Sequence, residues 1–217
     1  MSFITQEASS VQKALEIHGI ETPLHINYNN PNKRKKLIEK YLIKIIQLLN
    51  LDIKHESLSK TPKRVATMFV DEIFSGLNYN NFPKINLIKN NTNFNDMIIV
   101  RNIPFISFCE HHFITIDGTS TIAYIPNDNI IGLSKINRIV HFFSQRPQIQ
   151  ERLTQQILIA LQTILFTKHV AVSITATHYC MKAREIHTGD SVVVTTLFGG
   201  LFKSENHTQK KFLRIIS

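Results

Sequence analysis

The sequence predicts an α+β protein in which an N-terminal helical arm precedes an antiparallel sheet with helices on one face. Up to about residue 92, apolar residues recur every three to four positions, as they do in amphipathic helices. Beyond that point, segments rich in isoleucine, valine, threonine and phenylalanine alternate with helical stretches, which is typical of an α+β domain. We therefore divide the chain into a helical arm, residues 1–92, and a second domain, residues 93–217.

The arm is expected to hold three helices, over residues 4–18, 33–50 and 61–74. The third begins at Thr61-Pro62, which predicts a threonine N-cap followed by proline at the first helical position. The second is amphipathic. Its apolar positions are Leu37, Tyr41, Leu42, Ile45 and Leu49.

In the second domain, two strands are expected to form a hairpin with Asp117-Gly118 as its turn signal. Two helices follow, separated at Arg146-Pro147, and then two strands and a final helix. The expected strands cover residues 96–108, 113–125, 169–178 and 191–197, and the expected helices cover 134–144, 148–166 and 205–216.

The 217 residues carry a formal net charge of +9, which fits either a polyanionic partner or a lysine-rich solvated surface. The longest basic run, residues 33–36, is short, and no basic repeat interleaved with aromatic residues follows it. We therefore expect no nucleic-acid partner. There is no secretory signal and no apolar run long enough to span a membrane, so we expect a cytoplasmic protein without a membrane segment.

Both cysteines of the chain have histidines close by in the sequence. Cys109 and His112 form a C-x-x-H pair, and Cys180 follows His178 by two positions at the end of an expected strand. Two thiolates and one or two imidazoles suit zinc, and three protein ligands leave a coordination position for water, as in catalytic zinc sites. The alternative is two buried, unpaired cysteines beside surface histidines.

Two further histidines next to this motif have pKa values suited to proton transfer. His111 adjoins His112, and strand alternation would place His178 on the same face as Cys180. A structural, hydrogen-bonded histidine at a strand end is the alternative for His178.

Two other segments carry charge that suits a nucleotide. Ser134 is expected to cap a helix whose first turn holds Lys135 and Arg138, which predicts an anion site unless this helix start is simply a solvated surface. Glu151, in the next helix, could accept two N–H donors from guanine, although an exposed helix glutamate is the commoner case. Arg184, shortly after Cys180, could contact the same polyanion.

Taken together, these motifs resemble the GTP cyclohydrolase I family, and the resemblance covers nearly the whole chain. It is densest from residue 99 to 184. The segments that carry it are Cys109 to His112, Gly132 to Arg138 (GLSKINR), Gln145 to Leu153 (QRPQIQERL), His178 to Cys180, Arg184 and Gly199 to Phe202, with Thr61 to Arg64 and Asp71 to Phe74 in the arm.

The resemblance implies a tunnelling fold that assembles as a homodecamer of two pentamers, with active sites at subunit junctions. It also implies an enzyme that hydrolyses GTP to 7,8-dihydroneopterin triphosphate and formate, the first step of tetrahydrofolate biosynthesis. In such an enzyme, water activated by zinc attacks C8 of guanine.

The roles of individual residues are likewise implied by the resemblance. Zinc (Zn²⁺) would be bound by Cys109, His112 and Cys180, with His111 and His178 as acid/base residues. Glu151, supported by Gln150, would hold the guanine edge. The ribose triphosphate would meet Ser134, Lys135, Arg138 and Arg184, with Arg64 contributed by another subunit.

Two positions depart from the family pattern. Thr67 stands where a phosphate-binding lysine is common, and Glu185 stands where glycine is usual, which adds a negative charge beside the expected phosphate site.

Two other interpretations remain open from the residues. One is a different tunnelling-fold enzyme acting on a purine or pterin, such as a nitrile-reducing queuosine enzyme, which would not need two cysteines for zinc. The other is a basic, zinc-stabilised nucleic-acid-binding protein, whose binding would fall with salt.

Overall fold

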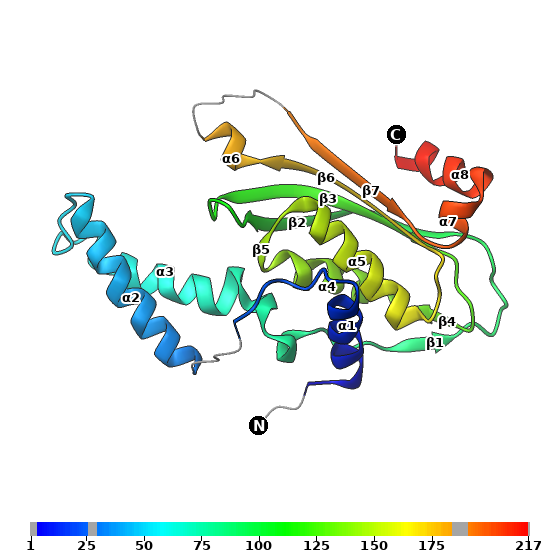
Figure 1. Cartoon of the computed structure of the whole chain (residues 1–217), viewed down its shortest axis with the longest axis horizontal. Helices are drawn as coiled ribbons and strands as arrows, with labels where there is room; N and C mark the ends of the chain where they lie inside the picture. Colours follow the sequence, from blue (N-terminus) through cyan, green and yellow to red (C-terminus); the bar gives the residue numbers. More distant parts are fainter. Residues whose placement is uncertain (1–3, 26–29, 184–190, 217) are drawn as a thin grey trace.

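The computed structural model describes residues 4–25, 30–183 and 191–216. A five-stranded sheet with the order β5-β2-β3-β6-β7 forms its centre (Figure 1). Every neighbouring pair is antiparallel except β5 and β2, which run parallel. The strands of this sheet are β2 (Ile98–Cys109), β3 (Thr115–Tyr124), β5 (Pro147–Gln148), β6 (Val170–His178) and β7 (Val193–Phe198).

Two long helices, α4 and α5, cover one face of this sheet (Figure 1). The main hydrophobic core lies between them and the sheet, and it takes the inward side chains of β2, β3 and β6. The α+β prediction is therefore confirmed, and the two long helices of the second domain lie on one face as expected. The helices of the described chain are α1 (Gln6–Ile17), α2 (Pro31–Leu48), α3 (Thr61–Thr67), α4 (Leu133–Ser144), α5 (Gln150–Leu165), α6 (Tyr179–Lys182), α7 (Leu201–Ser204) and α8 (Asn206–Ile216).

The hairpin turn between β2 and β3 lies at residues 110–114, so the prediction that Asp117-Gly118 forms it was wrong. Both residues are inside β3, where Gly118 pairs with Phe105. A Cβ on Gly118 would lie 2.4 Å from the carbonyl oxygen of Thr175 on β6. Glycine is needed here because the neighbouring strand approaches closely, not because the chain turns.

The short helices α7 and α8 pack against one end of the opposite sheet face (Figure 1). Phe202 and Phe212 are fully buried there against Ala123 and Ala171, which point away from the main core. This small second cluster was not foreseen in the sequence.

The N-terminal segment makes two kinds of contact with the rest of the chain. Helix α1 buries Ala8, Val11 and Leu15 in the main core, and β1 (Leu87–Lys89) pairs with β4 (Asn129–Ile131) in a separate two-stranded sheet. Helices α2 and α3 instead project away from the body (Figure 1). The boundary placed at residue 92 stays a prediction.

The third helix of the arm begins at Thr61, but its N-cap is Lys60 and no side chain caps it, so the expected threonine cap was wrong. The helix continues past Thr67 in wider π-helical geometry over Met68–Ile73 (η1). Proline still occupies the first turn, where its missing N–H costs no hydrogen bond. Two short 3₁₀ turns follow, η2 (Ser75–Leu77) and η3 (Tyr79–Asn81).

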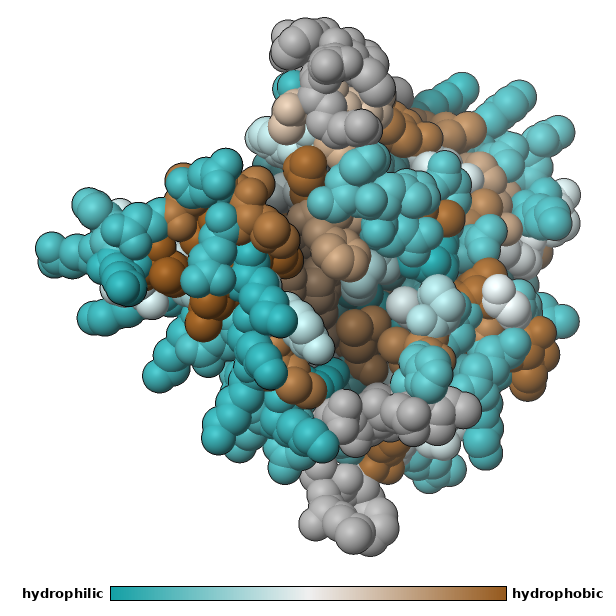
Figure 2. Space-filling model, turned by 60° about the vertical axis from the view of Figure 1, so that its left-hand side comes forward, coloured by the Kyte–Doolittle hydropathy of each residue, from teal (hydrophilic) through white to brown (hydrophobic). Residues whose placement is uncertain are grey.

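Most apolar side chains of α2 are not buried by other parts of the same chain. Only Ile46 is buried on this helix, while Tyr41 is 59% and Leu48 is 82% exposed. Figure 2 shows apolar surface on the arm and in the hollow beside it. Contiguous exposed apolar surface of this kind marks an interaction site. Within the described residues, no helix is long and apolar enough to cross a membrane.

Candidate metal centre

Cys109, His112 and Cys180 meet at one end of the sheet. Cys109 is the last residue of β2, His112 lies in the turn that follows, and Cys180 belongs to α6. Their sulfur and ring-nitrogen atoms all lie within 4.8 Å of one another. Cys109 is buried and His112 exposed, so the cluster opens to solvent on one side.

This donor set fits zinc. With Zn–S bonds of about 2.3 Å and Zn–N bonds of about 2.0–2.1 Å, two ligand atoms of one tetrahedral ion lie about 3.5–3.8 Å apart. The three donor atoms lie within 4.8 Å of one another, so side-chain shifts of at most about 1 Å bring them to that spacing. Two thiols and one imidazole are soft and borderline ligands of the kind that zinc prefers, and both cysteines are free of disulfides.

The turn that carries His112 is fixed by backbone hydrogen bonds to both sides. The Cys109 N–H donates to the Ile114 carbonyl at 2.8 Å, and the Glu110 N–H donates to the Gln148 carbonyl at 3.0 Å. The second bond extends the parallel pairing of β2 with β5, in which Cys109 faces Gln148. The short strand β5 therefore holds the turn in place from the side.

A chain of side-chain hydrogen bonds connects this turn to the N-terminal segment. Arg152 donates to the Glu110 carboxylate at 2.5 Å and, through Nε, to Gln148 Oε1 at 3.1 Å. Gln148 in turn donates to Gln156 Oε1 at 2.8 Å, and Gln156 donates to the Ile20 carbonyl at 2.8 Å. Gln148 and Gln156 are fully buried. These hydrogen bonds hold Glu110, the residue between Cys109 and His111, against α5.

Arg146, just before β5, is fully buried and carries its charge into the protein interior. Its Nη1 donates to Glu21 at 2.8 Å, and its guanidinium lies over the rings of Tyr79, Phe142 and Phe143 at 4.7–5.1 Å from their centroids. Tyr79 also donates a hydrogen bond to Glu21, and burial raises the pKa of its hydroxyl. The residue before β5 is thereby tied to the segment after α1.

Cys180 reaches the cluster by a route different from the one expected. Strand β6 ends at His178, and Tyr179–Lys182 forms the short helix α6. The strand alternation predicted for His178 and Cys180 was therefore wrong. The helical turn still brings the Cys180 thiol to Cys109 and His112.

His178 lies beside the first turn of α5. Its Nε2 is 2.8 Å from Oε1 of Gln150. Burial lowers the pKa of the imidazole below its ordinary 6.5, and the charge of Glu151 opposes that shift in part. The ring is consequently neutral at neutral pH, the state in which histidine accepts a proton.

His111 is the more exposed of the two acid/base candidates. Its Nδ1 is 3.8 Å from the Cys109 sulfur, and its Nε2 is 4.0 Å from Glu110 Oε1. Its side chain is 64% exposed, so its ring faces solvent beside the metal cluster. Glu151 is also exposed, in the first turn of α5.

The anion-binding candidates of α4 are not at this end of the molecule. Helix α4 begins after β4 and ends at Ser144, just before β5, and its 12 residues span about 18 Å. Ser134 and Lys135 lie in its first turn and Arg138 in its second, whereas its last residue leads into β5, which pairs with β2 at Cys109. The N-cap is Gly132 without a side-chain hydrogen bond, so the capping role predicted for Ser134 was wrong.

The remaining candidates lie on the arm or outside the described residues. Arg64 is exposed on α3 and lines a hollow at the tip of the arm together with Lys60 and His55. Thr67 closes α3. Arg184 and Glu185 fall outside the described residues, so the structure does not place them.

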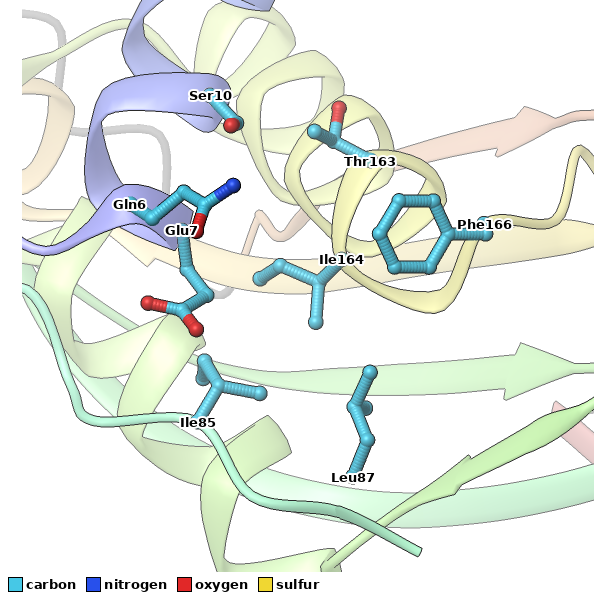
Figure 3. Close-up of a pocket in the computed structure, with 8 residues that line it drawn as sticks. All are labelled: Gln6, Glu7, Ser10, Ile85, Leu87, Thr163, Ile164 and Phe166. Atoms are coloured by element: carbon cyan, nitrogen blue, oxygen red, sulfur yellow. The ribbon is translucent and has the colours of Figure 1, made fainter. Parts of the chain in front are cut away.

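A second hollow of about 320 Å³ lies far from this cluster, between α1, β1 and the end of α5 (Figure 3). Its floor is apolar, with Ile85, Leu87 and Ile164, and Glu7 stands at its edge. It contains none of the predicted site residues.

Sequence reasoning missed the supports of the site rather than its chemistry. Glu110 and Arg152 lie inside recognised motifs, but nothing in the sequence indicates that they pair across 42 positions. A glutamate within a metal-binding turn is the one signal that could have prompted a search for its partner.

Comparison with known proteins bears on the whole chain. The model of the family described as GTP cyclohydrolase I matches residues 38–217. Proteins named GTP cyclohydrolase 1 from Serratia proteamaculans and Yersinia enterocolitica are 57% and 56% identical over 216 residues, covering 100% of this chain and 98% of each relative. One from an Enterobacter species is 56% identical over 218 residues, with the same coverage. The chain belongs to the GTP cyclohydrolase I family.

Proposed function

We propose that this chain is a zinc-dependent enzyme that hydrolyses GTP to 7,8-dihydroneopterin triphosphate and formate. The observation that carries the proposal is the cluster of Cys109, His112 and Cys180, with His178 directly before the helix that holds Cys180. Relatives over the full chain bear the name GTP cyclohydrolase 1. We place the reaction in the cytoplasm, as the first step of tetrahydrofolate biosynthesis.

Cys109, His112 and Cys180 would hold the ion and leave a coordination position open to solvent. When bound, Zn²⁺ would act as a Lewis acid that lowers the pKa of a water molecule to about 7, so that hydroxide would be available at neutral pH for addition to C8 of the guanine. Because His112 is exposed and Cys109 buried, the substrate approaches from the solvent side.

The two histidines divide the proton transfers. His178, neutral because burial lowers its pKa, accepts a proton from the attacking water. His111, exposed beside the cluster, donates a proton to a purine ring nitrogen and makes C8 more electrophilic. Each such transfer is typically worth about 10²–10⁴-fold in rate. Ring opening, a second hydrolysis that releases formate, and closure of the pterin ring from the sugar carbons then follow.

The first turn of α5 supplies the base-binding groups. Glu151 is exposed and close enough for its charge to act on His178, so we assign its carboxylate to the N1–H and 2-amino edge of the guanine, on the side of the base away from C8. A carboxylate can accept two N–H donors from that edge. Gln150, the residue before Glu151, is buried, so its side chain does not itself reach the base.

A second copy of the chain completes the phosphate-binding side. Ser134, Lys135 and Arg138 lie about 15, 14 and 9 Å along α4 from its last residue, Ser144, which leads into the strand beside Cys109. We propose that a neighbouring copy brings these residues to the triphosphate, with Arg64 from another arm and Arg184 from the segment after α6. Because Thr67 stands where a phosphate-binding lysine is common, this set of triphosphate-binding residues has one positive charge fewer.

This arrangement requires a closed oligomer. We propose a homodecamer of two face-to-face pentamers with active sites at subunit junctions. The uncovered apolar side of α2 supports an assembly in which the arms pack against other copies.

The test is turnover of GTP by the purified protein, measured as formate and as a fluorescent pterin after oxidation, with and without a chelator. Cys109→Ser should lose zinc and activity together. His178→Ala should keep zinc but lose formate release, whereas His207→Ala, which changes an exposed histidine on α8, should keep both. Formate release by metal-free protein, or full activity of Cys109→Ser, would contradict the proposal.

A further inference from the structure

The side chain of Gln150 is fully engaged by protein groups. Gln150 is 2% exposed, and its Nε2 lies 3.2 Å from the Ile174 carbonyl, 3.0 Å from the Val193 carbonyl and 3.1 Å from the Thr195 hydroxyl. Its Oε1 lies 2.8 Å from His178 Nε2. This amide joins α5 to β6, β7 and the candidate acid/base histidine at once.

The identity of these neighbours fixes which way the amide points. Carbonyl oxygens only accept hydrogen bonds, so the atom of Gln150 that faces Ile174 and Val193 must be the NH₂ group. The Thr154 hydroxyl donates to the main-chain carbonyl of Gln150 at 2.8 Å. Its hydrogen is thereby used, so the Thr195 hydroxyl, at 2.7 Å, donates to the Thr154 oxygen. The Thr195 oxygen is therefore also an acceptor for Gln150. A flipped amide would set oxygen against three acceptors.

The amide oxygen must then face His178, and it can only accept. His178 Nε2 therefore carries a hydrogen, and in the neutral ring the lone pair is on Nδ1. We infer that Gln150 is a positioning residue that holds His178 in the Nε2-protonated tautomer, so that Nδ1 is the atom that accepts the proton from the attacking water. The inference deepens the proposed function and rests on it for the role of His178.

This arrangement also separates the duties of two adjacent residues. The hydrogen-bonding groups of Gln150 are used inside the protein. Glu151 is left to face the base. Substitution of Gln150 should thus act on the chemical step rather than on substrate affinity.

The direct test is nitrogen-15 NMR of histidine-labelled, zinc-loaded protein at pH 8, above the ordinary pKa of a histidine side chain. The His178 signals are assigned by their loss in His178→Ala. We expect a protonated Nε2 and an unprotonated Nδ1. A protonated Nδ1 would overturn the inference, and this result does not depend on turnover or on any Gln150 variant folding.

The second test compares Gln150→Met with Gln162→Met, a matched change on the same helix whose amide only bonds the Lys168 carbonyl. Methionine keeps the length of the side chain but removes its oxygen and NH₂ group. We expect Gln150→Met to keep zinc and KM while kcat falls about 10- to 100-fold, part of the 10²–10⁴-fold available from acid/base catalysis. Gln162→Met should match the unmodified protein.

The outcomes separate this inference from the proposed function. Unchanged kcat in Gln150→Met, or a rise in KM alone, would overturn the positioning role while leaving the enzyme assignment intact. Failure of the unmodified protein to turn over GTP would remove the proposed function, whereas the NMR measurement would still report the tautomer.

Discussion

The metal end of the sheet and the start of α4 are built in opposite ways. At the metal end, the turn after Cys109 is held by backbone bonds to β5 and by Arg152, which bonds Glu110 and Gln148. At the start of α4, Ser134 and Arg138 stand exposed on an uncapped helix. The side chains at the metal end are held in place by partners within the same chain. The side chains at the start of α4 are exposed and lack such partners among the described residues, as expected of a surface that contacts another copy.

The largest expected effect comes from breaking the buried pair that ties the strand beside the metal turn to the N-terminal segment. Glu21→Gln leaves the fully buried Arg146 without its counter-charge. Removing one partner of a buried ion pair costs about 3–5 kcal/mol. At about 2–4 °C per kcal/mol for a chain of this size, Tm should fall by at least about 6 °C in a thermal scan. The exposed Glu16→Gln on α1 is the matched control, and an equal Tm in both variants would show that Arg146 does not need Glu21.

A smaller and more local effect is expected at Arg152. Arg152→Met keeps the aliphatic length but removes both bonds from the guanidinium to Glu110 and Gln148. Partners that orient a metal-binding segment typically contribute about 10–100-fold to metal affinity. Zinc should dissociate more readily in a chelator titration, while Tm of the zinc-free protein changes less than in Glu21→Gln. Arg101→Met, an exposed change on the same strand as Cys109, should titrate like the unmodified protein.

The parts of the fold and site that the sequence could predict are those decided by local patterns and by residue type. The long helices and strands follow from periodicity, because burial of one side repeats along the chain. Residue type and spacing indicated a possible zinc set around the two cysteines, and the choice of Cys109, His112 and Cys180 came from the family resemblance. Their chemistry is carried by residue type, and no knowledge of distant partners was needed.

The failures arise where a contact distant in the sequence, or a shift of a helix end by one residue, decides the structure. Gly118 was read as a turn residue, but β6 approaches so closely that no Cβ fits there. Ser134 was expected to cap α4, yet the helix begins one residue earlier at Leu133. Arg152 and Glu110 pair across the fold, and no spacing in the sequence records such a contact.

The open region is tested by changing a cation at the start of α4. Arg138→Gln removes an exposed charge that we assign to a phosphate group of the substrate. Hydrogen bonds to charged groups contribute about 1.5–3 kcal/mol, so KM for GTP should rise about tenfold or more, with zinc content and Tm unchanged. A change in zinc content would place Arg138 in the metal region instead.

A mixture of two variants tests whether the metal end and the start of α4 that form one active site belong to different copies of the chain. Oligomers assembled from Cys109→Ser and Arg138→Gln chains should regain activity at low GTP. By random pairing, about a quarter of the subunit junctions would carry an intact residue of each kind. A mixture of Cys109→Ser with Cys180→Ser should regain none, because both changes fall in one metal centre. Equal behaviour of the two mixtures would mean that a single chain supplies the whole site.

The smallest effect on Tm is expected from a surface ion pair, Lys211 with Asp96, which serves as the comparison for the buried pair of Arg146 and Glu21. Lys211 bonds both carboxylate oxygens of Asp96 at 2.8 and 3.0 Å and holds the pKa of that carboxyl below its ordinary 3.8. A lowered pKa means that the pair stabilises the fold at neutral pH and is lost only as the pH falls below 3.8. Both groups are well exposed, so water and salt screen the attraction. Asp96→Asn should therefore leave Tm unchanged at pH 7 in 0.15 M salt. A drop as large as that of Glu21→Gln would mean that burial is not what distinguishes the two pairs.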